Sequence, residues 1–531
     1  MGGATVRRND LLLTLLGVLM LALSRLPLHL GWLVFMAWLP YLYVFERGVR
    51  KGRQLLAMGF ITSAVYNLIV FYWFSLVTVP GLVGMILLYT LVWYLLFTCV
   101  NHIYRTLPRW RYLGFTALVL TFEYVQNFGE TRFPWFNLGY SLAEYNILVQ
   151  MADLVGIVGL SALILSVSVL LHQLLPTSHK WLLGRRSSAG NVLHPLRGRK
   201  IGSALALLAI FALWLGYGYR CLYKTPLEEH EAGIFVMQPS IDQEVKWDTE
   251  QYAKSLGVFK DLTLQAKAEG ARLVIYPEGA ITNYLLRIPA VQADLKDILD
   301  AAQADIFTGF PDLEPAPPGH PNDSVYYNAA SLFQPQQFTH EVYHKNILVP
   351  VAERMLWLDQ FSFMWKLQFG QANWEFGQEL RYYESGGYTF SPSICYELAF
   401  PEIFHRMALP RDVEQGGYRK CDYLVNITND AWFGTSYGPW LHAAMARFRA
   451  VENRVQIYRS ANTGISLVVD PLGRILVRTE LFETKNITAP LYTSAKEPLI
   501  RRIHRYPLII VALALLLVVL SYVKRIGRQL L

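Results

Sequence analysis

Long apolar runs fill the first 225 residues of the chain and return once near its C-terminus. Eight stretches contain almost no charged residue: 11–23, 30–45, 55–77, 82–104, 112–125, 148–175, 201–217 and 508–523. Each is long enough, or nearly so, to cross about 30 Å of hydrocarbon as a helix. We therefore predict eight transmembrane helices, of which 112–125 is the marginal one because it is short and carries Glu123 near its end.

Between residues 228 and 495 the pattern changes to short strand-like runs separated by helical ones. Runs rich in β-branched or aromatic residues and bounded by Gly, Pro, Asn or Asp predict strands at 233–237, 271–276, 305–309, 329–333, 341–345, 389–395, 422–428, 455–460 and 465–470. Helical spacing of apolar residues predicts helices at 249–269, 290–304 and 440–453. Such alternation predicts a layered α/β domain. We therefore divide the chain into a seven-helix transmembrane bundle (1–227), an extramembrane α/β domain (228–495) and a C-terminal transmembrane helix with its tail (496–531).

Composition and charge are those of a membrane protein and give it an orientation. Apolar residues make up 53% of the chain, and its mean hydropathy is +0.26. The formal net charge is +8, but basic residues gather in the connections around 47–53, 105–111 and 180–200 instead of forming a stripe on the α/β domain. Cytoplasmic loops carry such an excess of Lys and Arg. We therefore expect both termini in the cytoplasm, the α/β domain on the outer side, and no nucleic-acid partner.

One of the four cysteines is a candidate nucleophile. Cys99 lies inside an apolar stretch and Cys221 at the end of another, and Cys421 is interpreted as a structural or surface thiol. No two cysteines form a CxxC pair, so we expect no metal site. Cys395 ends a strand-like run, and Glu397 follows two positions later. A lone cysteine can act as a nucleophile where a base and an anion stabiliser converge on it. By itself it is also compatible with a small buried apolar side chain.

Two other strand ends offer the groups that such a cysteine needs. Glu278 stands in the segment Tyr-Pro-Glu-Gly-Ala at 276–280, directly after one strand-like run, and Lys345 ends another. A carboxylate can take the proton of a thiol, and a fixed cation can stabilise the charge that develops on a carbonyl oxygen. Alone, Glu278 would be interpreted as a turn residue and Lys345 as a surface charge. Together with Cys395 they predict a catalytic triad.

These three segments resemble the signature of the carbon–nitrogen hydrolase (nitrilase) superfamily. The whole architecture resembles a membrane-bound family within it, the bacterial apolipoprotein N-acyltransferases. The resemblance extends to the segments 426–434, 446–454 and 459–466 and covers nearly the whole chain. It implies an α-β-β-α sandwich for 228–495. It also implies that Glu278 is the general base, Cys395 the nucleophile and Lys345 the oxyanion stabiliser.

The resemblance implies supporting residues as well. The backbone N–H of Tyr396 would be a second oxyanion donor. Glu353 and Glu397 would hold the lysine and position the incoming amine, while an ion pair with Arg354 or Arg406 is the competing explanation for these two acids. The residues implied to bind lipid or substrate at the cleft are Trp247, Asn429 and Trp432. Tryptophans in general belong more often to the core, so their role depends on the resemblance.

The implied reaction has two steps and needs no cofactor. A phospholipid, expected to be phosphatidylethanolamine, gives an acyl chain to Cys395 and leaves as a lysophospholipid. The α-amine of the N-terminal S-diacylglyceryl cysteine of an apolipoprotein then attacks the thioester. Converting an oxoester to an amide runs downhill, and the chain has no P-loop or HExxH segment. The implied location is the periplasmic face of the bacterial inner membrane.

The run 355–367 is too apolar for an ordinary solvated loop and contains Trp357 and Phe361. One interpretation is a buried core helix. We favour a flexible arm at the bilayer surface that controls access of the acyl chain, because exposed aromatic patches mark membrane or partner contacts. On this interpretation Trp357 and Phe361 bind lipid.

Two other functions stay open. A membrane-tethered amidase or nitrilase would use the same triad, with water resolving the thioester; the bundle and the apolar arm favour acyl transfer over this alternative. A transporter with an outer substrate-binding domain would need charges along a path through the membrane. The main polar candidates, His102 and Glu123, both lie near the ends of their stretches.

Overall fold

The computed structural model of the chain describes residues 2–48, 50–175, 193–242, 252–338, 341–366, 372–408 and 421–530. The chain forms two compact units. The helical unit comprises residues 1–127, 134–224 and 502–531, and the sheet unit comprises residues 128–133 and 225–501.

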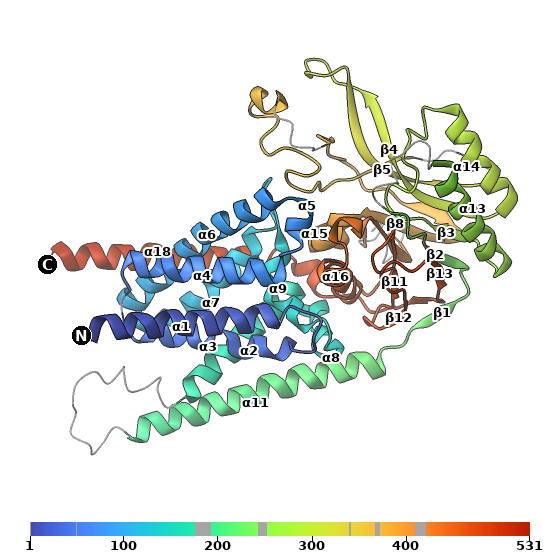
Figure 1. The fold of residues 1–531 in the computed structure, drawn as a ribbon. Coiled ribbons are helices and arrows are strands. Elements are labelled where there is room, and N and C mark those ends of the chain that lie inside the picture. The colour runs from blue at the N-terminus through green and yellow to red at the C-terminus, as the bar shows by residue number, and fades with distance from the viewer. Residues whose placement is uncertain are drawn as a thin grey trace. The chain divides into compact units, whose positions relative to one another are not determined.

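The helical unit is built from the apolar stretches (Figure 1). Its longer helices are α1 (Gly2–Leu23), α4 (Gly52–Val70), α6 (Val79–Thr106), α7 (Arg111–Val125), α9 (Ala152–Leu174), α11 (Leu193–Lys224) and α18 (Pro507–Leu530). Its shorter helices are α2 (Val34–Ala37), α3 (Leu39–Glu46), α5 (Phe74–Val77) and α8 (Asn146–Val149). Helix α4 packs along α1 and α6, and α18 packs along α6 and α7.

Five helices among the described residues are long and apolar enough to cross a membrane: Gly52–Val70, Val79–Thr106, Ala152–Leu174, Lys200–Lys224 and Pro507–Gly527. Asn9–Leu23 and Gly31–Glu46 are shorter apolar helices. The prediction of several membrane-spanning helices is confirmed, but length and composition alone do not reach the predicted count of eight. The stretch 30–45 is broken at Trp38, where α2 ends and α3 begins with Pro40 in its first turn, and α7 has only 15 residues.

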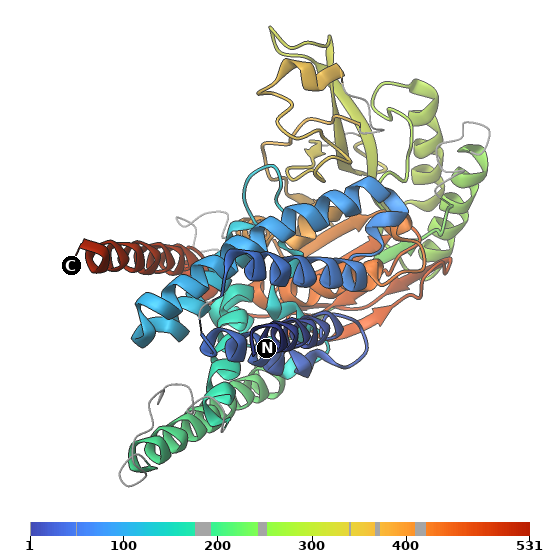
Figure 2. The ribbon, with the colours of Figure 1, turned by 60° about the vertical axis from the view of Figure 1, so that its left-hand side comes forward.

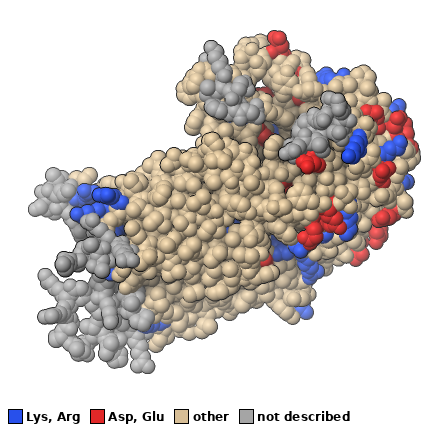
Figure 3. Space-filling view, in the orientation of Figure 1, with Lys and Arg blue, Asp and Glu red and all other residues tan. Residues whose placement is uncertain are grey.

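The surface of the helical unit is apolar. Leu87 on α6, Leu213 on α11 and Ile509 on α18 are all exposed. Figure 3 shows that the visible face of this unit is almost free of charged residues, with Lys and Arg gathered towards the C-terminal end of α18. Exposed apolar surface of this extent is what a helix presents to lipid.

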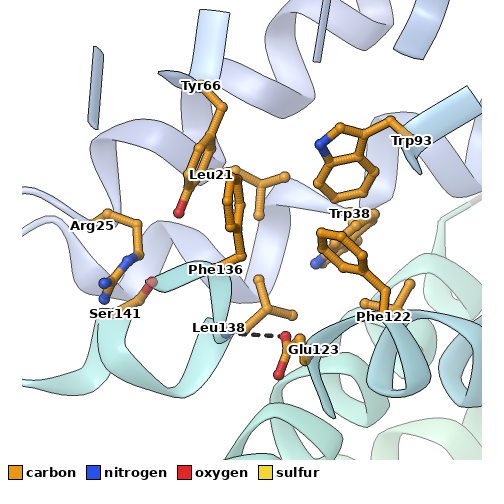
Figure 4. Close-up of a pocket in the computed structure, with 11 residues that line it drawn as sticks. Leu21, Arg25, Trp38, Tyr66, Trp93, Phe122, Glu123, Phe136, Leu138 and Ser141 are labelled. Atoms are coloured by element: carbon orange, nitrogen blue, oxygen red, sulfur yellow. Dashed lines mark hydrogen bonds between the residues drawn. The ribbon is translucent and has the colours of Figure 1, made fainter. Parts of the chain in front are cut away.

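Inside the helical unit, two buried polar side chains hold a connecting segment in place. Arg25 donates a hydrogen bond to the carbonyl of Trp135 (3.3 Å), and Glu123 accepts one from the N–H of Leu138 (3.0 Å). Both partners belong to residues 134–142, which form the 3₁₀ helices η3 (Pro134–Phe136) and η4 (Leu138–Leu142). Figure 4 shows the pocket that these side chains line, where about 10 Å³ is open to the centre of a water molecule. The pocket therefore has room for one water and none for a lipid chain.

The described residues of the sheet unit form two six-stranded sheets (Figures 1 and 2). One has the order β12-β11-β10-β9-β8-β7, with β7 (Tyr383–Ser385), β8 (Tyr388–Ile394), β9 (Tyr423–Thr428), β10 (Gln456–Ala461), β11 (Leu467–Val469) and β12 (Ile475–Arg478). The other has the order β13-β2-β3-β4-β5-β6, with β2 (Ile234–Gln238), β3 (Leu273–Ile275), β4 (Asp305–Pro315), β5 (Ser324–Phe333), β6 (Tyr343–His344) and β13 (Lys485–Thr488). β1 (Glu228–His230) and β14 (Leu491–Thr493) form a separate antiparallel pair.

The alternation of side chains along β2 shows how the layers form. Phe235 and Met237 belong to the core that contains residues of α13 (Tyr252–Ala268) and α14 (Pro289–Ala302), whereas Ile234 and Val236 belong to the core between the sheets. Successive side chains of a strand point to opposite faces, so a strand that is apolar throughout is buried on both. On the other sheet, α16 (Gly438–Asn453) packs on β10 and β11 and also contacts α15 (Pro401–Met407). The unit therefore has the α-β-β-α layering that the family resemblance implies.

Candidate active site

Strand ends from both sheets supply the candidate residues. Cys395 follows β8 and Asn429 follows β9, and these two strands are parallel, so their carboxyl ends lie at the same edge of one sheet. Glu278 follows β3 and Lys345 follows β6 in the other sheet. The N–H of Asn429 donates a 2.8 Å hydrogen bond to Oε2 of Glu278. This bond joins the two sheets at the site.

Two glycines set the position of Glu278. A Cβ at Gly309, on the neighbouring strand β4, would lie 2.8 Å from the backbone nitrogen of Gly279 and 3.0 Å from Cα of Glu278. Gly279 has a φ of +57°, in the left-handed region that glycine adopts without strain. The turn after β3 can therefore lie directly against β4 and present its carboxylate to the site.

Lys345 is almost fully buried between two carboxylates. Its Nζ lies 2.8 Å from Oε1 of Glu353 and 3.5 Å from Oε1 of Glu278. Burial lowers the pKa of Lys345, but the two carboxylates raise it by more, so the net pKa lies above its ordinary value. Lys345 is therefore a fixed ammonium group at neutral pH. Arg354, the alternative partner of Glu353, pairs instead with Asp359 (2.6 Å).

Asn328 links these two carboxylates, and it is not among the residues predicted from the sequence. Its Nδ2 donates to Oε1 of Glu278 at 2.7 Å and to Oε1 of Glu353 at 3.0 Å. Asn328 lies on β5 and is buried. The only signal in the sequence was an amide in the middle of a strand, and such an amide has many structural explanations.

Cys395 occupies a strained backbone position directly after β8. Its φ of +49° lies in the left-handed region, which costs a residue with a side chain about 1–2 kcal/mol. Its Sγ lies within 4.8 Å of a carboxylate oxygen of Asp430 and of a ring nitrogen of His442. Burial raises the pKa of Cys395, and the negative charge of Glu278 raises it further, while the ammonium of Lys345 lowers it by less. Cys395 is therefore a thiol at neutral pH and needs a base before it can attack.

Glu397 lies behind the site and organises the backbone around it. Its side chain is fully buried. The donors to its carboxylate are the hydroxyl of Tyr343 (2.8 Å) and the backbone N–H groups of Asn346 (2.6 Å), Ile347 (3.1 Å) and Ile394 (2.7 Å). Burial raises the pKa of Glu397 to about 7, because these hydrogen bonds offset the loss of solvation only in part. The donors flank Lys345 and Cys395 in the chain, so one carboxylate fixes the backbone beside both.

The other predicted residues are placed differently from one another. Tyr396 is buried, and its hydroxyl donates to the carbonyl of Arg132 (2.5 Å). Trp432, in η7 (Asp430–Phe433), is 52% exposed. Asn429 contacts Glu278 through its backbone N–H. Trp247 lies outside the described residues.

The described part of the run 355–367 is a loop whose one regular element is the 3₁₀ turn η5 (Ser362–Lys366); Met355 and Leu358 are buried in it. Trp357 and Phe361 are 47% and 50% exposed. Trp357 has a φ of +55°, and its N–H donates to the carboxylate of Glu130. The described residues therefore do not form the buried core helix that was the alternative interpretation of this run.

The site combines a thiol, a carboxylate and a buried ammonium group. The carboxylate of Glu278 is held by Asn328 and Asn429, so its position is fixed before any substrate arrives. A thiol with a nearby base can attack an acyl carbon, and an ammonium group can stabilise the resulting oxyanion. The arrangement is suited to acyl transfer through a thioester.

The chain is similar to known proteins over most of its length. Residues 234–496 match the family described as Carbon-nitrogen hydrolase, and residues 17–170 match the Apolipoprotein N-acyltransferase N-terminal domain. A relative from Geobacter metallireducens, named apolipoprotein N-acyltransferase, is 30% identical over 492 residues, which cover 90% of this chain and 88% of the relative. A relative of the same name from Chlorobaculum tepidum is 28% identical and covers 87% of this chain and 86% of the relative.

The solved structures that match include an amidase from Nesterenkonia sp., with 18% identity and a TM-score of 0.35 over 51% of this chain and 94% of that one. The family itself follows from the Geobacter relative, whose similarity spans both units. The chain belongs to the apolipoprotein N-acyltransferase family.

Proposed function

We propose that the protein transfers an acyl chain from a phospholipid to the N-terminal amine of an S-diacylglyceryl cysteine on an apolipoprotein, through a thioester on Cys395. The relatives that match over most of the chain carry the name of this activity. The observation that carries the mechanism is the placement of Lys345 between Glu278 and Glu353. From there its positive charge lowers the pKa of the Cys395 thiol.

In the first step, Glu278 accepts the thiol proton while Cys395 Sγ attacks the ester carbonyl of the phospholipid. The charge that develops on the carbonyl oxygen is stabilised by Nζ of Lys345 and by the backbone N–H of Tyr396. The tetrahedral intermediate collapses, the C–O bond to the glycerol breaks, and Glu278 returns the proton to the departing oxygen. The products are the thioester and a lysophospholipid.

In the second step, the α-amine of the diacylglyceryl cysteine attacks the thioester carbonyl. Glu278 accepts a proton from the amine, the same two donors stabilise the oxyanion, and the C–S bond breaks. The sulfur takes the proton back from Glu278, so the enzyme is regenerated. Glu353 and Asn328 keep Lys345 and Glu278 in place through both steps. Glu397 acts through the backbone beside Lys345 and Cys395, so its support of the amine step is indirect.

We place the chemistry at the outer face of the bacterial inner membrane. The proposed architecture is a seven-helix bundle (1–227), a periplasmic domain (228–495) and an eighth helix with its tail (496–531). The start of α1 and the end of α18 lie at the same end of the helical unit (Figure 1). An even number of crossings places both termini on one side, and the basic loops assign that side to the cytoplasm.

The lipid substrate is proposed to contact exposed aromatic side chains of the sheet unit. Trp357, Phe361 and Trp432 are about half exposed, which is unusual for side chains of this size. Trp247 and Asn429 complete the proposed cleft. Phosphatidylethanolamine is the proposed donor.

Intact-mass measurement of the full-length purified protein tests this function. After mixing with vesicles of phosphatidylethanolamine of one acyl composition, the protein should gain the mass of one acyl group, and Cys395→Ala should not. Adding a synthetic S-diacylglyceryl cysteine peptide should remove the adduct and yield N-acylated peptide. Absence of the adduct would overturn the proposal. Release of free fatty acid with the peptide unchanged would identify a hydrolase, as in the amidase alternative.

A further inference from the structure

A buried polar network contacts the carbonyl oxygen of Cys395. His442, on α16, is buried, and its Nε2 lies 3.1 Å from the carbonyl oxygen of Cys395. Its Nδ1 lies 3.0 Å from Oδ1 of Asp430 and 3.1 Å from Nη2 of Arg459. The same Nη2 of Arg459 lies 2.7 Å from Oδ2 of Asp430. None of these groups belongs to the triad.

The partners of the two ring nitrogens fix the tautomer of His442. A carbonyl oxygen can only accept, so Nε2 carries a hydrogen and donates it to Cys395. Arg459 can only donate, so Nδ1 can accept from its Nη2. Burial lowers the pKa of His442, and the positive charge of Arg459 lowers it further, so the ring is neutral at pH 7. The neutral ring with its hydrogen on Nε2 therefore donates to Cys395 and accepts from Arg459. No hydrogen then lies between Nδ1 and Oδ1 of Asp430, so Asp430 acts on the ring through Arg459, which it holds by its Oδ2.

The carbonyl that His442 holds is one end of a peptide group whose other end is the N–H of Tyr396. In a planar trans peptide the C=O and N–H point in opposite directions. A donor that fixes the direction of the Cys395 carbonyl therefore also fixes the direction of the Tyr396 N–H. A hydrogen bond to the carbonyl also polarises the amide and strengthens its N–H as a donor.

Because the backbone at Cys395 is strained, the peptide that follows it needs hydrogen bonds from its surroundings to keep its direction. The φ of +49° is disfavoured for a residue with a side chain, so the peptide keeps its direction only if its surroundings impose it. Gly464 makes room for the network, because a Cβ there would lie 2.5 Å from Oδ2 of Asp430. Asp430 is further held by the hydroxyl of Thr428, at 3.0 Å from Oδ1.

We propose that His442, held by Arg459 and through it by Asp430, is a positioning residue that aims the N–H of Tyr396 at the oxyanion formed on the acyl carbon. The inference rests on the proposed function, because the oxyanion is the one that forms in the proposed acyl transfer, and it adds a positioning residue to that same site. His442 touches no reacting atom in this role. Its substitution should impair steps that pass through an oxyanion and spare a reaction of the same sulfur that does not.

The test compares two reactions of Cys395 in the full-length purified protein. A p-nitrophenyl ester acylates the thiol through an oxyanion and gives a burst of p-nitrophenolate, whereas iodoacetamide alkylates the thiol without one. His442→Leu should lower the burst rate by about 100-fold, the loss found when one oxyanion donor is removed. The alkylation rate should change by less than about threefold. His442→Gln, whose amide reaches the place of Nε2, should restore most of the burst rate, whereas His442→Asn, whose shorter amide reaches only the place of Nδ1, should not.

His405→Leu is the matched control, because His405 is also buried in the sheet unit and its Nδ1 pairs with Asn453 (3.0 Å). It should leave the burst rate unchanged. Equal losses in both reactions, or no rescue by glutamine relative to asparagine, would overturn the role of His442; the glutamine and asparagine pair decides the matter if the leucine variant does not fold. A wild-type burst with the ester but no adduct from phospholipid overturns the proposed donor and leaves the role of His442 tested. No burst from wild-type protein overturns both.

Discussion

The side-chain amide of Asn328 donates a 2.7 Å hydrogen bond to Oε1 of Glu278 and a second one, of 3.0 Å, to Glu353. The two carboxylates that flank Lys345 thus share one neutral donor in a partly buried place. Asn328→Ala leaves both acceptors short of a partner, and the acyl-enzyme should form at least about tenfold more slowly, as measured by intact mass against time. Loss of a partner by a buried acceptor also costs about 1–3 kcal/mol of stability.

Asn453→Ala provides the control for Asn328. Asn453 is also buried in the sheet unit, and its Nδ2 donates to the carbonyl of Arg449 (2.9 Å). Its loss should lower the melting temperature by a similar amount and leave the rate of acylation unchanged. If Asn328→Ala and Asn453→Ala, at equal stability, slow acyl-enzyme formation by the same factor, Asn328 has no role in the site beyond stabilising the fold.

The thiol of Cys395 should respond in opposite directions to the loss of its two charged neighbours. The carboxylate of Glu278 raises the pKa of Cys395 and the ammonium of Lys345 lowers it. Glu278→Gln should therefore increase the thiolate fraction at pH 7 and speed alkylation by iodoacetamide, about tenfold for each unit by which the pKa falls. Lys345→Met should raise the pKa and slow alkylation at the same pH.

The pH profile of alkylation measures both shifts. The rate should rise with pH and level off above the thiol pKa, with the midpoint displaced to lower pH in Glu278→Gln and to higher pH in Lys345→Met. Both variants should be inactive in acyl transfer, although one is the more reactive towards iodoacetamide. Midpoints that move in the same direction would contradict the electrostatic account of the site.

The exposed aromatic loop should matter for lipid turnover and not for the thiol itself. Trp357 and Phe361 are about half exposed, so about half of each residue is not covered by the rest of the sheet unit. Replacing both by serine should slow acylation by phospholipid vesicles by about tenfold or more, if the loop binds lipid. Alkylation of Cys395 by iodoacetamide should stay at the wild-type rate. Ile475→Ser is the control, because it also removes exposed apolar surface, here on the edge strand β12, and it should affect neither reaction. If the aromatic variant lost acylation and alkylation equally, the loop would support the fold instead of binding lipid.

The hydrophobic pattern predicted the central strands because each is buried on both faces. The run at 233–237 is apolar throughout, and the run at 422–428 is apolar apart from Asp422, Asn426 and Thr428; these runs form β2 and β9. The edge strands β12 and β13 were missed, since β12 is largely exposed and β13 contains Lys485 and Asn486. An edge strand is defined by its neighbour in space, and its own sequence carries little of that information.

The site was predictable only where a residue type has a chemical purpose of its own. Cys395, Glu278 and Lys345 could be named from strand ends and from the family resemblance. Asn328 and His442 could not, because an amide on a strand and a histidine on a helix have many structural explanations. The role of each follows from the atoms that its side chain contacts in the structure, such as the carbonyl oxygen of Cys395 at 3.1 Å from Nε2 of His442.

Gly309 should be required for the position of Glu278 more than for the stability of the sheet. A methyl group at Gly309 would meet the backbone of Gly279 and Glu278 at 2.8 and 3.0 Å, and backbone atoms cannot turn away as a flexible side chain can. Gly309→Ala should therefore move the carboxylate away from Asn328 and the N–H of Asn429, and the rate of acyl-enzyme formation should fall by about tenfold or more, as expected for a displaced catalytic group.

Gly257→Ala is the control, because Gly257 lies on α13 with nothing within 4 Å of the added methyl, and alanine there should stabilise the helix by about 0.5–1 kcal/mol. Wild-type rates of acylation in Gly309→Ala would show that the turn after β3 can shift without moving the carboxylate.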